Sequence, residues 1–368
     1  MDMLLHQSGR IKNISIAIIF LITLTIIAVV IVGCSPKSIS PTLDSAEAYY
    51  NRGLEYYNRG ELDRAIKDFD QAIQLKPDYA NAYYNRGLAY RHKGDLDQAI
   101  SDYNRAIQIN PADAVIYNDR GFAYSQKGDL DSAISDWDKA IQINPGSAEA
   151  YSNRGYAYTL KGDLDRAISD LDQAIQLNPK DAMAYLNRGL TYATTGDMER
   201  AINDYDQAIK IQPDFAQAYF NRGLVYAQQG DLDHAISDYD QAIRHNPDFA
   251  DAYYYRGNAY LAKDDLDQAI NDYDKAIQLK PDNAGAYNNR GHAYGRKDKW
   301  NRAISDLNKA IQLNPQYVQA YYNRGIVYAN QGEKANAIAD LTKVLELCDT
   351  NEELCQAAEE TLQQLGGQ

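Results

Sequence analysis

Residues 80–113 read ANAYYNRGLAYRHKGDLDQAISDYNRAIQINPAD, and close copies of this unit recur along most of the chain. Eight prolines and nine glycines keep the same spacing of 34 residues. Self-similarity at a fixed period of this size is typical of a repeat array. Nine units therefore cover residues 46–351. They begin at residues 46, 80, 114, 148, 182, 216, 250, 284 and 318.

Each unit predicts a hairpin of two helices. Tyr83, Gly87 and Tyr90 have spacings of four and three residues, which place them on one helix face. A glycine inside a helix costs about 1 kcal/mol relative to alanine, so Gly87 is expected to let the second helix approach closely. Pro111 ends the second helix, because the residue before a proline disfavours helix. A single hairpin cannot bury its apolar face alone, so we expect the hairpins to stack.

The pattern Tyr-x2-Arg-Gly-x2-Tyr, then Ala-x3-aromatic, then Ala and Pro, resembles the tetratricopeptide repeat. Its Asn-Arg-Gly form resembles one that is frequent in cyanobacterial proteins. The resemblance implies an all-α, right-handed α-solenoid of nine helix-turn-helix repeats. It also implies that the first helices line a concave groove, which binds extended peptides or partner helices. Residues 352–368 are predicted to form a C-terminal capping helix and tail.

Two positions depart from the family pattern, counting the first residue of each unit as position 1. Position 7 is arginine and position 23 is aspartate in all nine units. The turn falls near positions 14 and 15, so positions 7 and 23 lie level on the two helices. Because arginine offers a planar fork of donors and a buried arginine needs a partner, we predict an ion pair in each unit, formed within the repeat or to the next. The alternative is an arginine ladder that grips acidic peptides or phosphates.

The predicted structural ion pairs join two sets of residues. The arginines are Arg52, Arg86, Arg120, Arg154, Arg188, Arg222, Arg256, Arg290 and Arg324. The aspartates are Asp68, Asp102, Asp136, Asp170, Asp204, Asp238, Asp272, Asp306 and Asp340.

Position 6 is asparagine in seven units, with Asp119 and Tyr255 in the other two. An amide can hold a peptide backbone without reading side chains. The row resembles the asparagine ladder of the repeats in O-linked N-acetylglucosamine transferase. The alternative is that asparagine is simply common at this position in the family. The row consists of Asn51, Asn85, Asn153, Asn187, Asn221, Asn289 and Asn323.

Apolar side chains are predicted in the middle of the groove, where they would either form a binding strip or contact a neighbouring first helix. These residues are Tyr156, Leu186, Leu190, Phe220 and Leu224.

The first 33 residues predict an export signal or a membrane anchor. Arg10 and Lys12 precede an uncharged run over residues 14–32. The run ends in Ile-Val-Gly before Cys34, which resembles a bacterial lipobox and implies lipidation of Cys34. An uncleaved helix of this length would nearly cross a bilayer. Both interpretations place the later residues in the periplasm or exterior. Residues 34–45 are Ser/Pro-rich and predict a flexible tether.

The composition excludes several classes of function. A net charge of -14 argues against a nucleic-acid partner. The five histidines and three cysteines form no metal-binding motif, and we find no nucleophile elbow or phosphate-binding loop. We therefore expect no catalysis, no cofactor, no metal and no small-molecule substrate.

Cys348 and Cys355 are seven residues apart. They would be too far apart on one continuous helix, but they can meet if the residues between them form a turn. An oxidising compartment would then allow a disulfide. The alternative is two small buried residues.

These observations predict a bacterial envelope protein that binds another protein or peptide and acts as an adaptor. Two alternatives remain open. The array can be a self-associating structural protein, or the targeting subunit of an enzyme complex encoded elsewhere. The sequence does not distinguish binding in the groove from binding on the convex face.

Overall fold

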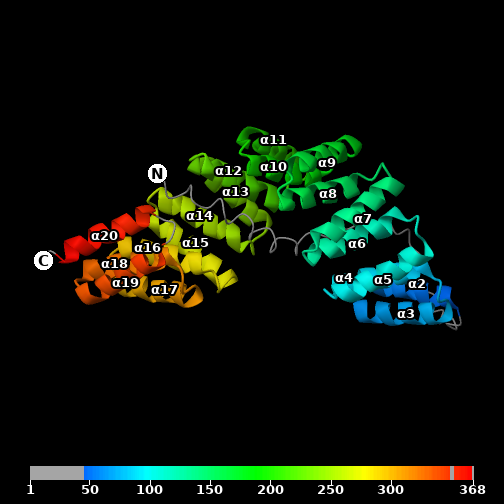
Figure 1. Ribbon diagram of the computed structural model, residues 1–368, viewed down its shortest axis with the longest axis horizontal. Coiled ribbons are helices and arrows are strands. Elements are labelled where there is room, and N and C mark those ends of the chain that lie inside the picture. The colour runs from blue at the N-terminus through cyan, green and yellow to red at the C-terminus, as the bar shows by residue number, and fades with distance from the viewer. Residues whose placement is uncertain (1–44, 349–351, 367–368) are drawn as a thin grey trace. The chain divides into compact units, whose positions relative to one another are not determined.

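The computed structural model describes residues 45–348 and 352–366. These residues form helices joined by short turns, and they contain no strand (Figure 1). They divide into two compact units, one ending at Arg200 and the other beginning at Ala201. Each unit is considered separately below. The predicted all-α repeat fold is confirmed.

The described helices follow the predicted hairpin order. The first helices of the repeats are α2 (Ala46–Asn58), α4 (Ala80–His92), α6 (Ala114–Gln126), α8 (Ala148–Lys161), α10 (Ala182–Thr195), α12 (Ala216–Gln228), α14 (Ala250–Ala262), α16 (Ala284–Arg296) and α18 (Val318–Gln331). The second helices are α3 (Leu62–Leu75), α5 (Leu96–Ile109), α7 (Leu130–Ile143), α9 (Leu164–Leu177), α11 (Met198–Ile211), α13 (Leu232–His245), α15 (Leu266–Leu279), α17 (Trp300–Leu313) and α19 (Lys334–Leu347). Every first helix begins at a predicted repeat start.

The residues at positions 15 and 16 form the turn between the two helices of a hairpin. Gly94 has φ +83°, a left-handed conformation that suits glycine. Asp95 then caps α5, because its carboxylate accepts a hydrogen bond from the backbone N–H of Gln98 at 3.3 Å. Asp264 and Asp298 take the left-handed position in two later repeats.

Close approach of the two helices depends on the glycine at position 8. A Cβ added to Gly155 of α8 would lie 2.8 Å from Leu171 Cγ in α9. It would also lie 3.1 Å from the carbonyl oxygen of Ala167. Ala167, Leu171 and Ala174 are fully buried on the facing side of α9. The packing role predicted for the glycine therefore has a direct structural basis.

Neighbouring hairpins pack through the second helix of one repeat and the first helix of the next, as α3 does with α4 and α13 with α14. Neighbouring first helices also touch, for example α2 with α4 and α14 with α16. Second helices of neighbouring repeats approach each other less closely. Within each unit the first helices therefore form the tighter side of the stack. We call the side carrying their positions 2, 5, 6, 9, 12 and 13 the inner face.

Position 10 distinguishes the start of the array from its interior. In the later repeats this position is small or β-branched and buried between hairpins, as Ala89 and Ala157 are. In the first repeat it is Glu55, whose side chain is 67% exposed and pairs with Arg59. A charged, solvated end is what a solenoid needs where stacking stops.

The last repeat is covered by α20 (Glu352–Gly366), which packs on α18 and α19. Ala358 of α20 is fully buried beside Leu341 and Val344. A disulfide joins Cys348 to Cys355, with 6.2 Å between their Cα atoms.

The N-terminal predictions fall on residues that the structure does not describe. The predicted signal or anchor, Cys34 and the tether as far as residue 44 all lie outside the described residues. Among the helices that are described, none has both the length and the apolarity needed to span a bilayer.

Candidate protein-interaction surface

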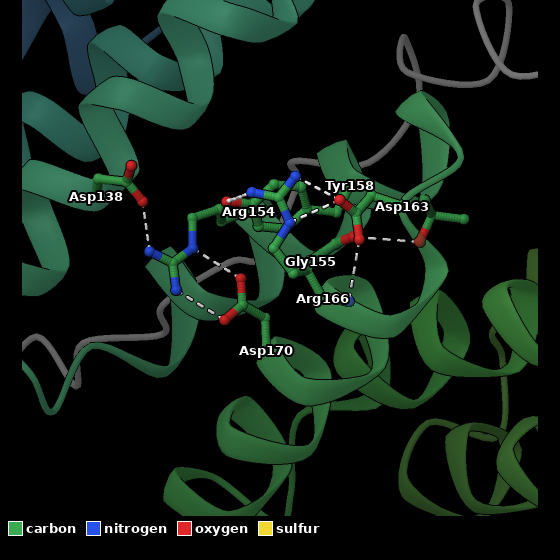
Figure 2. Close-up of polar contacts among 8 residues, drawn as sticks. Asp138, Arg154, Gly155, Tyr158, Asp163, Arg166 and Asp170 are labelled. Atoms are coloured by element: carbon green, nitrogen blue, oxygen red, sulfur yellow. Dashed lines mark hydrogen bonds and ion pairs between the residues drawn. The ribbon is translucent and has the colours of Figure 1, made fainter.

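The arginine at position 7 links three helices of two adjacent repeats. Arg154 of α8 donates from Nε to Asp170 Oδ2 and from Nη2 to Asp170 Oδ1, both at 2.7 Å. Its Nη1 donates to Asp138 Oδ1 at 2.5 Å. Asp170 belongs to α9 of the same repeat and Asp138 to α7 of the preceding repeat (Figure 2). The guanidinium therefore connects both helices of its hairpin to the neighbouring hairpin.

The bidentate pair is formed in the eight repeats whose arginine and aspartate lie in the same unit. The pairs are Arg52–Asp68, Arg86–Asp102, Arg120–Asp136, Arg154–Asp170, Arg222–Asp238, Arg256–Asp272, Arg290–Asp306 and Arg324–Asp340. The ninth predicted pair, Arg188 with Asp204, combines residues of the two units and stays a prediction.

A second acceptor, which was not predicted from the sequence, lies at position 25 of the preceding repeat. Eight repeats carry aspartate or asparagine there, and the ninth carries Thr342, which no later arginine follows. The acceptors are Asp70, Asn104, Asp138, Asp172, Asp206, Asp240, Asp274 and Asn308. The recurrence of aspartate or asparagine at position 25, with a single exception in the last repeat, is the sequence pattern from which this acceptor could have been predicted.

These ion pairs are largely buried, so their role is structural. Asp170 is 10% exposed in its side chain and Arg154 is 17% exposed. Burial raises the pKa of Asp102, and the hydrogen bonds from Arg86 offset that rise only in part. Because the guanidinium nitrogens already bind carboxylates or amides, the arginine row is a poor candidate for gripping acidic peptides or phosphates.

The asparagine row at position 6 also forms contacts within the array. Five of its seven amide nitrogens donate to the position 5 side chain of the preceding repeat. Asn85 donates to the Tyr50 hydroxyl at 3.0 Å, and Asn153 donates to Asn118 Oδ1 at 3.1 Å. Within the described residues, the side-chain oxygens of Asn85 and Asn153 accept no hydrogen bond, so these oxygens can accept from a bound peptide.

The remaining members of the asparagine row vary in their contacts. Asn187 is 8% exposed and donates to Ser152 Oγ at 3.4 Å. Asn221 and Asn323 accept from glutamines one turn earlier, and Asn323 also donates to Asn288.

Asn289 donates to the Tyr254 hydroxyl and to Asn258. Asn51, at the start of the array, is exposed. The row therefore joins neighbouring first helices, and peptide binding by it stays a prediction.

Two of the predicted groove residues are buried, which favours the predicted alternative of helix packing over an exposed binding strip for these two. Phe220 is 1% exposed and packs on Tyr239, Phe249 and Tyr255, while Leu186 is 6% exposed. Both residues are at position 5, where side chains can contact the following repeat, as Phe220 contacts Tyr255.

Partly exposed apolar side chains instead follow position 9 of the first helices. Tyr156, Leu190 and Leu224, which were predicted for the groove, are at this position. Phe122 and Ile326 are at the same position and are also partly exposed, although the sequence analysis missed them. The inner face of unit 1 therefore carries an apolar row. In unit 2, considered by itself, fewer repeats have an apolar residue at position 9.

Position 9 is polar in two repeats of unit 2, where Asn258 and His292 replace the apolar residue. The fully buried Tyr273 donates from its hydroxyl to Asn258 Oδ1 at 2.8 Å. Tyr239 occupies the equivalent place one repeat earlier, but its buried hydroxyl has no hydrogen-bond partner in the structure. Of these two hydroxyls, the one with a partner is therefore that of Tyr273, for which position 9 supplies an acceptor.

This contrast predicts opposite effects for two matched substitutions. Tyr273→Phe is expected to lower the free energy of unfolding by about 1 kcal/mol, because it removes a buried hydrogen bond. Tyr239→Phe is expected to leave stability unchanged or to raise it, because the unpaired hydroxyl is removed. Urea denaturation followed by circular dichroism measures both variants. Equal losses in the two variants would contradict the assignment.

The described residues contain no group of three or more His, Cys, Asp or Glu side chains that could hold a metal ion. The polar residues described above are engaged mainly with one another across repeats. This arrangement builds a rigid surface on which an apolar row and amide oxygens are presented.

Models of the tetratricopeptide repeat match most of the array. One of them alone matches half of the chain, over residues 123–162, 155–196, 191–230, 257–298 and 296–332. Others match residues 50–114, 216–249, 318–351, 102–135 and 238–271. The comparison with curated proteins finds no match.

Two solved structures resemble the chain in fold. A tetratricopeptide repeat protein from Parabacteroides merdae is 22% identical, with a TM-score of 0.55, over 64% of this chain and 93% of its own. The structure of the APC/C hetero-tetramer Cut9-Hcn1 is 18% identical, with a TM-score of 0.57, over 87% of this chain and 76% of its own. The period, the hairpin packing and the family models agree, and the chain belongs to the tetratricopeptide repeat family.

Proposed function

We propose that the protein is a non-catalytic scaffold or adaptor of the bacterial cell envelope. In this proposal an extended peptide or a partner helix of another protein binds along the inner face. Family membership supports the coarser part, a scaffold for protein–protein interaction.

The apolar row at position 9 carries the proposal. Leu88, Phe122 and Leu190 are partly exposed on neighbouring or nearby first helices of unit 1. Exposed apolar side chains that repeat along one surface favour a partner that buries them. The free side-chain oxygens of Asn85 and Asn153 lie on the same face, where they can accept backbone N–H groups of that partner.

Two observations support an envelope location. The Cys348–Cys355 disulfide is of a kind that persists mainly in oxidising compartments. The uncharged run over residues 14–32, followed by Cys34, has the pattern of an exported lipoprotein or of an N-terminal anchor.

Site-specific photocrosslinking in the bacterial cell tests both parts. A photoreactive amino acid at Phe122 or Leu190 is expected to capture the same partner. At Leu75 or Leu177, which are 53% and 38% exposed on second helices, it is expected not to capture that partner. We expect the crosslinked product in the membrane fraction with the disulfide oxidised. Capture from the second helices alone would contradict inner-face binding, and recovery from the cytosol would contradict the envelope location.

A further inference from the structure

A charged cluster interrupts the inner face of unit 1 between its first three repeats. It contains Asp119 and Phe122 of α6, Tyr84 and Arg91 of α4, Tyr57 of α2 and Tyr103 of α5. We call these six residues the Asp119 cluster. Asp119 occupies position 6, where seven of the nine repeats have asparagine. The chain has therefore placed a charge where its own pattern has a neutral amide.

Asp119 has fewer strong hydrogen bonds than the buried aspartates at position 23. The Tyr84 hydroxyl donates to its Oδ2 at 2.6 Å, while Arg91 Nη1 lies 3.4 Å from its Oδ1. Charge-assisted bonds between these groups are usually about 2.7–2.9 Å long. The Asp119 side chain is 15% exposed, and burial raises its pKa despite the attraction of Arg91. Oδ1 therefore has room for a stronger donor.

Arg91 already places a guanidinium in the cluster, where its side chain is 14% exposed. Its Cζ lies 5.0 Å from the centre of the Phe122 ring, a cation–π distance. The position 7 arginines donate from several nitrogens at about 2.5–2.8 Å, whereas Arg91 makes one long contact with Asp119. The cluster thus has an aromatic face and a carboxylate in the arrangement that a guanidinium needs.

The cluster also contains an unpaired buried hydroxyl, of the kind that Tyr239 has at the same repeat position. Tyr103 is fully buried, and its hydroxyl has no hydrogen-bond partner in the structure. Burial raises the pKa of Tyr103; the attraction of Arg91 opposes this rise, and Asp119 and Tyr57 add to it. An unpaired hydroxyl is costly to bury, so a ligand that brings N–H donors to the cluster would satisfy it as an acceptor.

We propose that the Asp119 cluster binds an arginine side chain of the partner peptide, which displaces Arg91 from Phe122 and donates to Asp119. The inference rests on the proposed inner-face binding. The net charge of -14 favours a cationic ligand. Asp113 and Glu149 on the neighbouring segments add negative charge. The charge of Asp113 contributes to the raised pKa of Asp119, and the Glu149 carboxylate accepts a hydrogen bond from the Asn118 side chain. A carboxylate or phosphate would be repelled at this place.

Arginine suits the cluster better than lysine. The planar guanidinium can stack on Phe122 while its edge donates to Asp119 and to the Tyr103 hydroxyl. An ammonium is a more strongly hydrated point charge, which loses more hydration on entering a partly buried cluster.

The test measures peptide affinity by NMR titration of the folded protein with acetyl-Gly-Arg-Gly-amide. Peptides with citrulline or lysine in place of arginine are titrated in parallel. Asp119→Asn is expected to weaken binding of the arginine peptide by about tenfold, since it removes a charge-assisted bond. Arg91→Gln is expected to strengthen it severalfold, because the internal competitor is gone. The citrulline and lysine peptides are expected to bind more weakly than the arginine peptide.

Controls separate recognition from general charge and from folding. Asp131→Asn removes an exposed charge that pairs with Lys161 on the outer side of unit 1, and it is expected to bind as the wild type does. Asp119→Asn restores the residue found in seven repeats, so we expect it to fold, as circular dichroism will check. Tyr84→Phe is a second variant that keeps the charge but removes the hydroxyl holding Asp119, and it is expected to weaken binding.

Unchanged arginine binding in Asp119→Asn, or equal binding of the citrulline peptide, would overturn the proposal. Arg91→Gln with no gain in affinity would also overturn it. These failures leave the crosslinking result untouched, so failure of the arginine inference is distinguishable from failure of inner-face binding.

Discussion

Replacing Arg154 by leucine is expected to lower the free energy of unfolding by about 3 kcal/mol, because it leaves the buried Asp170 without its partner. Asp170→Leu alone is expected to cost a similar amount, since Arg154 would then keep only the contact to Asp138. Urea denaturation followed by circular dichroism measures each loss.

The double variant Arg154→Leu/Asp170→Leu is expected to recover a large part of this loss. Two apolar side chains of suitable size can replace a buried ion pair at little net cost. Asp138→Asn is the control. Asp138 is 54% exposed, so removing its charge is expected to change stability by less than about 1 kcal/mol. If neither single variant is less stable than the double variant, the pair does not act as a unit.

Gly155→Ala is expected to cost about 2 kcal/mol, because the added methyl group would overlap Leu171 and press on the backbone oxygen of Ala167. The leucine side chain can move, but the carbonyl oxygen can move only with the helix α9. The gain in helix propensity from alanine, about 1 kcal/mol, opposes this cost without removing it.

Gly146→Ala provides the matched control. Gly146 lies in the loop before α8, its φ is not positive, and an added Cβ would meet only Asn144 Oδ1 at 3.4 Å. We expect its stability to lie within about 0.5 kcal/mol of the wild type. Equal stability of Gly155→Ala and Gly146→Ala would show that close approach of α8 and α9 is not required.

The sequence predicts the fold more completely than it predicts the inner face, and the residues at positions 5 and 9 show why. Position 9 and position 5 both lie off the packed side of the first helix, and the sequence treats Leu190 and Phe220 alike. Stacking covers Phe220 with Tyr239 and Phe249 and leaves Leu190 partly exposed. The distinction depends on the angle between neighbouring first helices, which helical periodicity alone does not contain.

The sequence by itself determined the repeat boundaries, the two helices of each hairpin and an ion pair between positions 7 and 23. These features depend on spacing along one helix and on the height of residues across one turn, which are local quantities. The sequence left open whether Arg154 pairs within its own repeat or with a neighbouring one, and the structure shows the pair with Asp170 of the same repeat. The tertiary structure alone decided that Arg154 also reaches Asp138 and that Asp119 lies beside Arg91 and Tyr84. Those contacts join different repeats, so they depend on how one hairpin is placed on the next, and that placement results from the packing of whole faces.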